Sequence, residues 1–430
     1  MVVMSPEEYL IKNVLLPVGG KEGWCAPRDV LIRDGVIAAV EEPQPGGSAM
    51  QTEAASARRV ISCDGETHLL IPGMHNAHTH SSNFFIKGGL APLPLELMVA
   101  CGAYLPESHV WKAEGIGYGA KEGDQTERYR LGALATGLHT LLSGATSLVD
   151  MISLPGDEEG AMRCLVAAAK GYRQSGCRVF LGPQFDDSKD GEGGVSGKTV
   201  NFLAPATSAV RASAAATMAA DGGLRGLDAD GGLHADRWPT DPAKTRLAVR
   251  VWRRAILELH RPEDGVHIVL APHNERTCSR ELFLAAAALM REFPGVFATT
   301  HLLEGLHQPI AGGADTEGDL SASVRVLDEC GFLTERTTLA HCVHLTAADM
   351  RLLAERGCVV SHNPVSNLRL GAGIADVLAM RRAGCRVGIG VDGHGSGVEY
   401  VCTHSLRRKS RLDSSIVTPD QKSIRSSLIR

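Results

Sequence analysis

Two histidines, His78 and His80, follow the apolar run LLIPG and are separated by a single residue. Side chains alternate along a strand, so residues two apart point to the same face and two imidazoles there can bind one metal ion. A His-x-His pair is also compatible with a purely structural role. Its position relative to the other polar residues therefore decides how it is interpreted.

Three further candidate residues also end apolar runs. His301 closes VFATTH, His341 closes TTLAH, and Asp392 closes CRVGIGVD. Each run is typical of a strand, and in a parallel barrel the catalytic residues lie at the carboxyl ends of the strands. Such consistent placement predicts a site built from several strand ends, and not a chance scatter of histidines.

The elements that would position these residues are short apolar runs that alternate with segments of helical period. We expect strands near residues 70–75, 146–151, 177–182, 266–271, 296–301, 337–341, 357–361 and 385–391. Eight such strands predict an α/β fold, a (β/α)8 barrel of the TIM type over residues 70–400. An open doubly wound sheet is the less favoured alternative, because no GxGxxG motif follows the first strand.

Three segments differ from this pattern. Residues 9–69 hold short β-branched runs separated by Asp-Gly turns, which predicts the N-terminal β unit of a small β-sandwich accessory domain. Residues 186–245 are rich in Gly, Ala, Asp and Ser and are expected to form a mobile insertion without a catalytic role. Residues 405–430 are polar and basic, which is typical of a disordered tail.

Composition restricts the class of partner. The net charge of -5 disfavours nucleic acid, and no apolar run reaches the roughly 18 residues of a membrane helix. The eleven cysteines include no CxxC pair, so neither a disulfide framework nor a thiolate metal site is indicated. We therefore expect a cytoplasmic protein that binds a small molecule, with a homo-oligomer left open.

The segments PGMHNAHTH, THLLE, LAHCVHL, SHNPVSNLRLGAG and GVDG occur in this order. Together they resemble the branch of the amidohydrolase superfamily that holds cytosine deaminase, triazine hydrolase and S-adenosylhomocysteine deaminase. The resemblance runs from about residue 9 to 397 and implies metal ligands at His78, His80, His301 and Asp392.

The same resemblance implies roles for other residues. It assigns Glu304 and His341 to moving protons and polarising water or substrate, and it counts Asp392 among the catalytic groups. It further implies substrate contacts from Ser366 and Asn367, and from His273 in the loop after the fourth strand.

The expected ligand set agrees with the chemistry of zinc. Three imidazoles and one carboxylate suit one zinc ion, with iron(II) as the alternative, whereas calcium or magnesium would need mostly oxygen ligands. A bound cation would lower the pKa of water to roughly 7 and so provide hydroxide. Glu304 could move a proton from this water to a ring nitrogen. The resemblance implies that two-metal members carry a carbamylated lysine at the end of the fourth strand. No lysine ends VHIVLAPH in this chain, and its absence favours a single ion.

The sequence therefore predicts a metal-dependent hydrolase of non-peptide carbon–nitrogen bonds. Deamination of a nitrogen heterocycle such as a purine, pterin, pyrimidine or triazine is the leading hypothesis. Hydrolysis of an amide or a carbon–halogen bond by the same site, and an inactive relative that serves as a binding protein, remain alternatives. The substrate itself is not identified, because specificity resides in loops.

Two departures from the family pattern affect these expectations. Glu275 and Arg276 stand where the family has an apolar or aromatic pair, which changes what this wall of the pocket recognises. The residues after Asp392 are too polar to supply an outer helix and the strands that complete the accessory domain. We therefore expect a chain truncated at its C-terminus, with unpaired strand edges that favour self-association.

Other candidates receive no direct role. His139, Cys278 and Cys342 are expected to be packed residues, whereas His344, His362 and His394 are expected to support the site at most.

Overall fold

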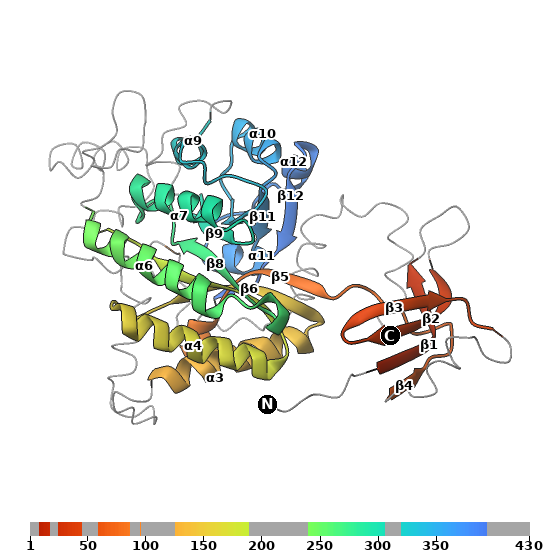
Figure 1. The fold of residues 1–430 in the computed structure, drawn as a ribbon. Coiled ribbons are helices and arrows are strands. Elements are labelled where there is room, and N and C mark those ends of the chain that lie inside the picture. Colours follow the sequence, from red (N-terminus) through yellow and green to blue (C-terminus); the bar gives the residue numbers. More distant parts are fainter. Residues whose placement is uncertain are drawn as a thin grey trace. The chain divides into compact units, whose positions relative to one another are not determined.

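The computed structural model describes residues 8–17, 25–44, 59–86, 95, 125–188, 240–305 and 320–393. The chain divides into two compact units, Met1–Gly73 and Met74–Arg430 (Figure 1). Within the described ranges, no helix has both the length and the apolar character needed to cross a bilayer.

The N-terminal unit contains one four-stranded sheet in the order β3-β2-β1-β4. Its strands are β1 (Glu8–Pro17), β2 (Cys25–Arg33), β3 (Val36–Glu41) and β4 (Arg59–Ser62). β2 is antiparallel to both β1 and β3, whereas β4 is parallel to β1. The turn between β2 and β3 is Asp34-Gly35, and both residues have positive φ, as a two-residue hairpin of type I′ requires.

The second unit is a closed parallel barrel. Its strands are β5 (Met74–His80), β6 (Ala145–Ser153), β7 (Arg178–Phe185), β8 (Val266–Pro272), β9 (Phe297–Leu302), β10 (Thr337–His341), β11 (Val359–His362) and β12 (Arg386–Ile389). Each strand pairs with the next, and β12 returns to β5 through the pair Ile389–Asn76. The short strand β13 (Asp392–Gly393) extends this closure along β5. The predicted α/β fold with eight barrel strands is confirmed, and the open sheet is excluded.

Helices connect the barrel strands (Figure 1). They are η2 (Ser81–Ile86), α3 (Gln125–Leu142), α4 (Glu158–Ser175), α6 (Pro242–Leu259), η4 (Pro262–Asp264), α7 (Arg280–Glu292), α9 (Ala322–Glu329), α10 (Ala347–Glu355), α11 (Pro364–Arg369) and α12 (Val377–Arg382). Polar side chains accept backbone N–H groups at the starts of several helices, as N-caps do; these are Asp157, Asp241, Ser279, Thr346 and Asp376. These capping residues mark the positions at which each loop ends and the helix begins.

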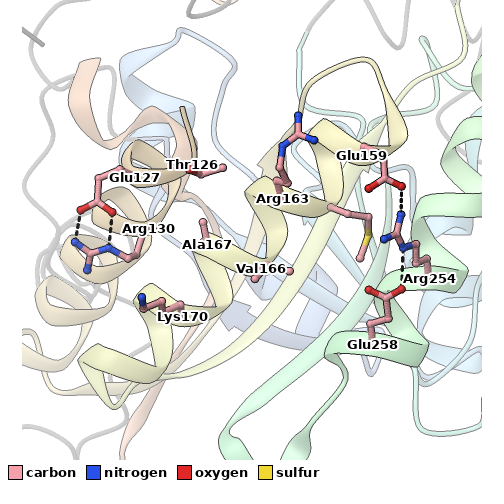
Figure 2. Close-up of a pocket in the computed structure, with 11 residues that line it drawn as sticks. Thr126, Glu127, Arg130, Glu159, Arg163, Val166, Ala167, Lys170, Arg254 and Glu258 are labelled. Carbon is pink, nitrogen blue, oxygen red and sulfur yellow. Dashed lines mark hydrogen bonds and ion pairs between the residues drawn. The ribbon is translucent and has the colours of Figure 1, made fainter. Parts of the chain in front are cut away.

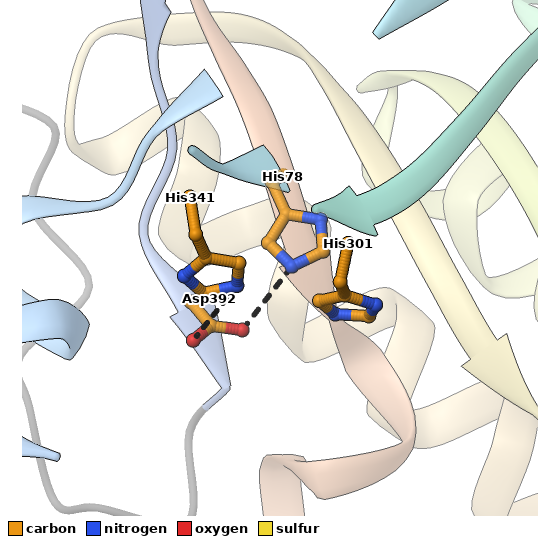
Figure 3. Close-up of side chains that lie close together, drawn as sticks. All are labelled: His78, His301, His341 and Asp392. Atoms are coloured by element: carbon orange, nitrogen blue, oxygen red, sulfur yellow. Dashed lines mark ion pairs between the residues drawn. The ribbon is translucent and has the colours of Figure 1, made fainter. Parts of the chain in front are cut away.

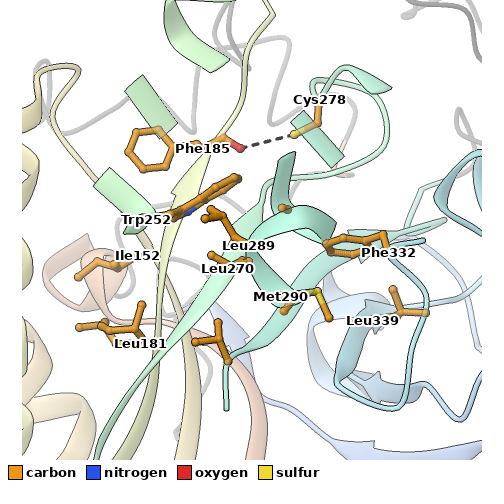
Figure 4. Packing of buried hydrophobic residues seen from close by; sticks show 14 of the residues in the cluster. Ile152, Leu181, Phe185, Trp252, Leu270, Cys278, Leu289, Met290, Phe332 and Leu339 are labelled. Atoms are coloured by element: carbon orange, nitrogen blue, oxygen red, sulfur yellow. Dashed lines mark hydrogen bonds between the residues drawn. The ribbon is translucent and has the colours of Figure 1, made fainter. Parts of the chain in front are cut away.

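The apolar core lies between the barrel strands and the helices, and Figure 4 shows part of it. Trp252 of α6 is fully buried, packs edge-on against Phe185 and donates its indole N–H to the carbonyl of Pro183 at 2.8 Å. Phe283 and Phe332 meet in a similar edge-to-face contact. Burial of each such side chain contributes about 1.5–3 kcal/mol, so this layer stabilises the barrel that carries the site.

Two boundaries differ from the sequence-based expectation. The first barrel strand begins at Met74 and not near Leu70, because its buried face consists of Asn76, His78 and His80 and lacks an apolar signature. The expected insertion ends earlier than residue 245, since α6 begins at Pro242 with Asp241 as its N-cap. Residues 189–239 of that insertion, and the expected tail at 405–430, lie outside the described residues.

Candidate metal-dependent active site

The predicted site residues lie at the carboxyl ends of the barrel strands. His78 and His80 occupy the end of β5, His301 lies next to last in β9, and His341 is the last residue of β10. Asp392 opens β13 and pairs in register with Thr79, between the two histidines of β5. Parallel closure therefore gathers side chains that are more than 300 residues apart in sequence at one end of the barrel.

Figure 3 shows that the side chains of His78, His301, His341 and Asp392 lie close together. One ligand atom from each of His78, His301, His341 and Asp392 can be chosen so that all lie within 4.8 Å of one another. The Nε2 atom of His80 lies 3.2 Å from His301 Nε2 and 3.2 Å from Asp392 Oδ1. The structure thus brings together the four expected ligands and adds His341 to the same cluster.

At three residues near the site the backbone adopts a conformation that is rare for residues other than glycine. His341, Asp392 and Leu303 have φ values of 71°, 65° and 45°, in the left-handed region. Each such residue costs on the order of 1–3 kcal/mol, and such strain is concentrated at functional sites. Positive φ values thus occur at two residues of the cluster and at the residue that precedes Glu304.

Backbone carbonyls fix the tautomers of two histidines. His80 Nδ1 lies 2.7 Å from the carbonyl oxygen of Met151, and His301 Nδ1 lies 2.7 Å from that of His273. A carbonyl oxygen only accepts, so each Nδ1 carries the proton in the neutral ring. Each Nε2 atom then carries a lone pair directed at the centre of the cluster. Histidines that bind metals have this arrangement, with a hydrogen-bond acceptor at the other ring nitrogen.

Burial and charge set the protonation of the cluster. Burial lowers the pKa of His78 to about 4 and also lowers the pKa of His301 and of His341. Burial alone would raise the pKa of Asp392, but its contacts with His78 and His80 hold it well below its usual value. Burial likewise opposes the charge on His80, yet Asp392 outweighs burial and raises the His80 pKa. The carboxylate of Asp392 and the neutral rings of His78, His301 and His341 are in the states that bind metals, whereas His80 binds a metal only after it releases the proton that Asp392 favours.

A second observation, the environment of two buried ring nitrogens, also indicates that the cluster can hold a divalent cation. His78 Nε2 lies 3.2 Å from Asp392 Oδ1, and His341 Nε2 lies 3.9 Å from Oδ2. Neither nitrogen has a hydrogen-bond partner among the described residues, although both are buried. Buried polar atoms without partners are costly, and a cation bound between them would satisfy both nitrogens and the carboxylate.

His341 is connected to the two other residues expected to act with it. Its Nδ1 donates to Asn367 Oδ1 at 2.8 Å and lies 3.5 Å from Glu304 Oε1. The amide oxygen therefore fixes the tautomer of His341 and leaves Nε2 as a lone pair. Glu304 is nine-tenths buried beside this ring, in a position to exchange a proton within the site.

Ser366 and Asn367, which the resemblance assigns to substrate, contact two residues that are expected to be catalytic, Asp392 and His341. Ser366 Oγ donates a hydrogen bond to Asp392 Oδ2, while Asn367 binds His341. Both residues lie in α11, which begins two residues after the end of β11. These two side chains thus hold Asp392 and His341 in place through hydrogen bonds.

His273 and Glu275 lie in the loop after β8. The His273 ring lies 5.0 Å from the His301 ring between centroids, and its Nδ1 lies 3.1 Å from Thr277 Oγ1. Glu275 is buried, which raises the pKa of its carboxyl group, and its Oε1 accepts the N–H of Leu303 at 3.2 Å. Glu275 thereby supports the segment that leads into Glu304.

Asp150 was missed by the sequence analysis. It ends the run TSLVD in β6 just as Asp392 ends its own run, so the signal was present. In the structure its buried carboxylate accepts hydrogen bonds from Ser81, the residue that follows His80. The next residue, Met151, supplies the carbonyl that orients the His80 ring.

The minor candidates fall outside the cluster. Cys278 and Cys342 are buried free thiols, and His139 packs edge-on against Phe84. His344 Nε2 lies 2.8 Å from the carbonyl of Ala372. His362 is buried at the end of β11, whereas His394 lies outside the described residues.

A separate pocket of about 380 Å³ lies between α3, α4 and α6 (Figure 2). Its charged walls include Arg130 paired with Glu127, and Arg254 paired with Glu159 and Glu258. None of the residues that line it belongs to the histidine cluster. This pocket therefore does not hold the candidate active site.

Comparison with known proteins places the chain in a family. The model of the amidohydrolase family matches residues 69–413, which include all the site residues described above. The chain belongs to the amidohydrolase family, and the prediction of an amidohydrolase-type enzyme is confirmed.

Curated relatives carry deaminase names. The chain is 28% identical over 404 residues to a 5'-deoxyadenosine deaminase of Methanothermobacter thermautotrophicus, which covers 91% of this chain and 72% of that protein. It is also 28% identical over 344 residues to a 5-methylthioadenosine/S-adenosylhomocysteine deaminase of Archaeoglobus fulgidus, covering 79% of this chain and 62% of the relative. These names agree with the branch that the sequence motifs resemble.

Solved structures support the barrel. An atrazine chlorohydrolase from Arthrobacter aurescens TC1, complexed with zinc, superposes with a TM-score of 0.69 at 20% identity, over 94% of this chain and 76% of that one. An adenosine deaminase from Xanthomonas campestris with bound zinc gives a TM-score of 0.63 at 20% identity, over 96% and 75%. At this identity the likeness concerns the fold.

Proposed function

We propose that this chain is a metal-dependent aminohydrolase that converts the 6-amino group of an adenine nucleoside to a carbonyl and releases ammonia. The observation that carries this proposal is the convergence of four histidines and Asp392 at the carboxyl end of the barrel. The substrate class is supported by the 5'-deoxyadenosine and 5-methylthioadenosine/S-adenosylhomocysteine deaminases that match most of the chain.

We assign one divalent ion, zinc in the first place and iron(II) as the alternative, to His78, His80, His301 and Asp392. Neutral imidazoles and a carboxylate suit either ion. Such an ion supplies Lewis-acid activation of water at neutral pH. No lysine occurs in β8, so the described residues offer no bridging ligand for a second ion there.

The protein's own groups then account for the movement of protons. Attack on the ring forms a carbon–oxygen bond, and the carbon–nitrogen bond breaks only if nitrogen leaves as ammonia. Glu304, beside His341, is placed to pass one proton of the attacking water to the ring nitrogen and the second to the amino nitrogen, which then leaves as ammonia. Proton transfer of this kind contributes about 10²–10⁴ in rate. His341, held by Asn367, presents a neutral Nε2 to the same space.

We further assign Ser366 and Asn367 to orienting Asp392 and His341, because their side chains contact these residues. His273 remains a proposed substrate contact, since its ring borders His301 at the edge of the cluster. Glu275 completes this wall of the site.

The test is ammonia release by the zinc-loaded full chain. The panel holds 5'-deoxyadenosine, 5'-methylthioadenosine, S-adenosylhomocysteine, adenosine, guanine, cytosine and atrazine, with chloride release followed for atrazine. We expect ammonia from one or more of the adenine nucleosides and none from the double variant His78→Ala, His80→Ala. Turnover of atrazine alone would contradict the proposal and favour carbon–halogen hydrolysis. Zinc binding without turnover of any compound would favour a binding protein.

A further inference from the structure

Asp150 is a fully buried carboxylate in the second half of β6, three residues before the strand ends. It pairs in register with Thr79 of β5, the residue between His78 and His80. The proposed reaction does not use Asp150, yet it lies on the strand that pairs with β5, the strand that supplies two of the proposed ligands. Its contacts therefore bear on how that strand is held.

Three donors surround this carboxylate. Its Oδ1 accepts the backbone N–H of Ser81 at 2.8 Å, and its Oδ2 accepts the Ser81 hydroxyl at 2.5 Å. The phenol of Tyr172, from α4, also donates to Oδ2 at 2.8 Å. Burial raises the pKa of the Asp150 carboxyl group, while the donors from Ser81 and Tyr172 favour its ionised form.

These contacts act on His80 from two directions. Ser81 is covalently joined to His80, so Asp150 fixes the backbone at which the chain leaves β5. The neighbouring carbonyl of Met151 fixes the ring through Nδ1 at 2.7 Å. Two successive residues of β6 thus determine where His80 Nε2 points.

We propose that Asp150, supported by Tyr172, is a positioning residue that holds His80 in the geometry required to bind the metal ion. This inference rests on the proposed metal site. Tyr172 belongs to an outer helix, so its hydrogen bond to Asp150 couples the packing of α4 to the proposed metal site.

The structure contains a second buried aspartate with the same pattern of donors, and this one is not next to a proposed metal ligand. Asp187 accepts the N–H of Ser279 at 2.7 Å and its hydroxyl at 2.5 Å, and Thr245 Oγ1 donates to the same carboxylate at 2.8 Å. Ser279 caps α7 and is not adjacent to a histidine of the cluster. Thr245→Val therefore removes the counterpart of the Tyr172 hydrogen bond at a carboxylate that has no contact with a proposed metal ligand in the hydrogen bonds described.

The experiment compares zinc affinity, measured by chelator competition, for the full-length parent, Asp150→Asn, Tyr172→Phe and Thr245→Val. Loss of an outer hydrogen bond to a ligand system typically costs about 10–100-fold in metal affinity. We expect a loss of that size for Asp150→Asn, a smaller loss in the same direction for Tyr172→Phe, and parent affinity for Thr245→Val. The visible absorption of the Co²⁺ forms should change for the first two variants only.

Thermal unfolding of each variant separates local from general effects. If Asp150→Asn does not fold, Tyr172→Phe decides the question, because it leaves the carboxylate and Ser81 in place. Parent affinity in both Asp150→Asn and Tyr172→Phe overturns the positioning role while the proposed function stands. An equal loss in Thr245→Val also overturns it, because the effect is then general. A parent chain that binds no zinc overturns the metal site and this role together.

Discussion

His80 and His301 present their Nε2 atoms to each other at a distance of 3.2 Å, and each ring is held there by a backbone carbonyl at its Nδ1 atom. In neutral rings both of these Nε2 atoms carry lone pairs, which repel one another unless a positive charge lies between them. The fold holds them at this distance through β5, β6 and β9. The site is therefore arranged for a cation by the barrel itself.

Removal of two of the proposed ligands should abolish metal binding. We expect about one divalent ion per chain in the parent and almost none in His78→Ala, His80→Ala, because two of four ligands are lost. Elemental analysis after gel filtration measures this content. His68→Ala, at an exposed histidine of the N-terminal unit, serves as the control and should keep the full content. A double variant with parent metal content would contradict the ligand assignment.

Glu304→Gln should keep the metal and lose turnover. The amide has nearly the same size but can neither accept nor return a proton, so kcat should fall about 10²–10⁴-fold. Metal analysis and steady-state kinetics are measured on the same sample. Glu355→Gln, on the exposed face of α10, should leave kcat unchanged. A decrease of only a few-fold would remove Glu304 from the mechanism.

Much of the barrel could be predicted because its signal is local. The apolar runs that end in His301, His341 and Asp392 mark three strands, and the carboxyl ends of barrel strands must lie together. β5 was placed too early because its buried face is polar, and its residues are buried by the site and not by apolar packing. The hydrogen bonds from Ser81 to Asp150 and from Asn367 to His341 depend on which strands and loops become neighbours, which no local pattern specifies.

Asn367→Leu should impair turnover more than metal binding. Leucine has a similar volume but cannot accept the Nδ1 proton of His341, so the ring loses the contact that fixes its tautomer. We expect kcat to fall about 10–100-fold, the range seen when supporting contacts are removed. Zinc affinity should stay close to that of the parent, because Asn367 has no contact with the four proposed ligands in the hydrogen bonds described. A large loss of zinc with unchanged kcat per bound metal would assign Asn367 to the metal site instead.

Gly171→Ala should destabilise the barrel although alanine favours a helix by about 1 kcal/mol over glycine. Gly171 lies in α4, and a Cβ there would come within 2.2 Å of the Arg130 carbonyl oxygen and 2.9 Å of the Leu134 nitrogen in α3. Backbone atoms cannot rotate away, so the two helices must separate, at a cost of about 1–3 kcal/mol from overpacking. Denaturant unfolding measures the change. Gly295→Ala, where no atom beyond the residue and its two chain neighbours lies within 4 Å of the added carbon, is the matched control and should be neutral. Because Tyr172 follows Gly171, the same displacement should draw its hydroxyl from Asp150 and weaken zinc binding. Parent stability in Gly171→Ala would show that α3 and α4 do not pack this closely.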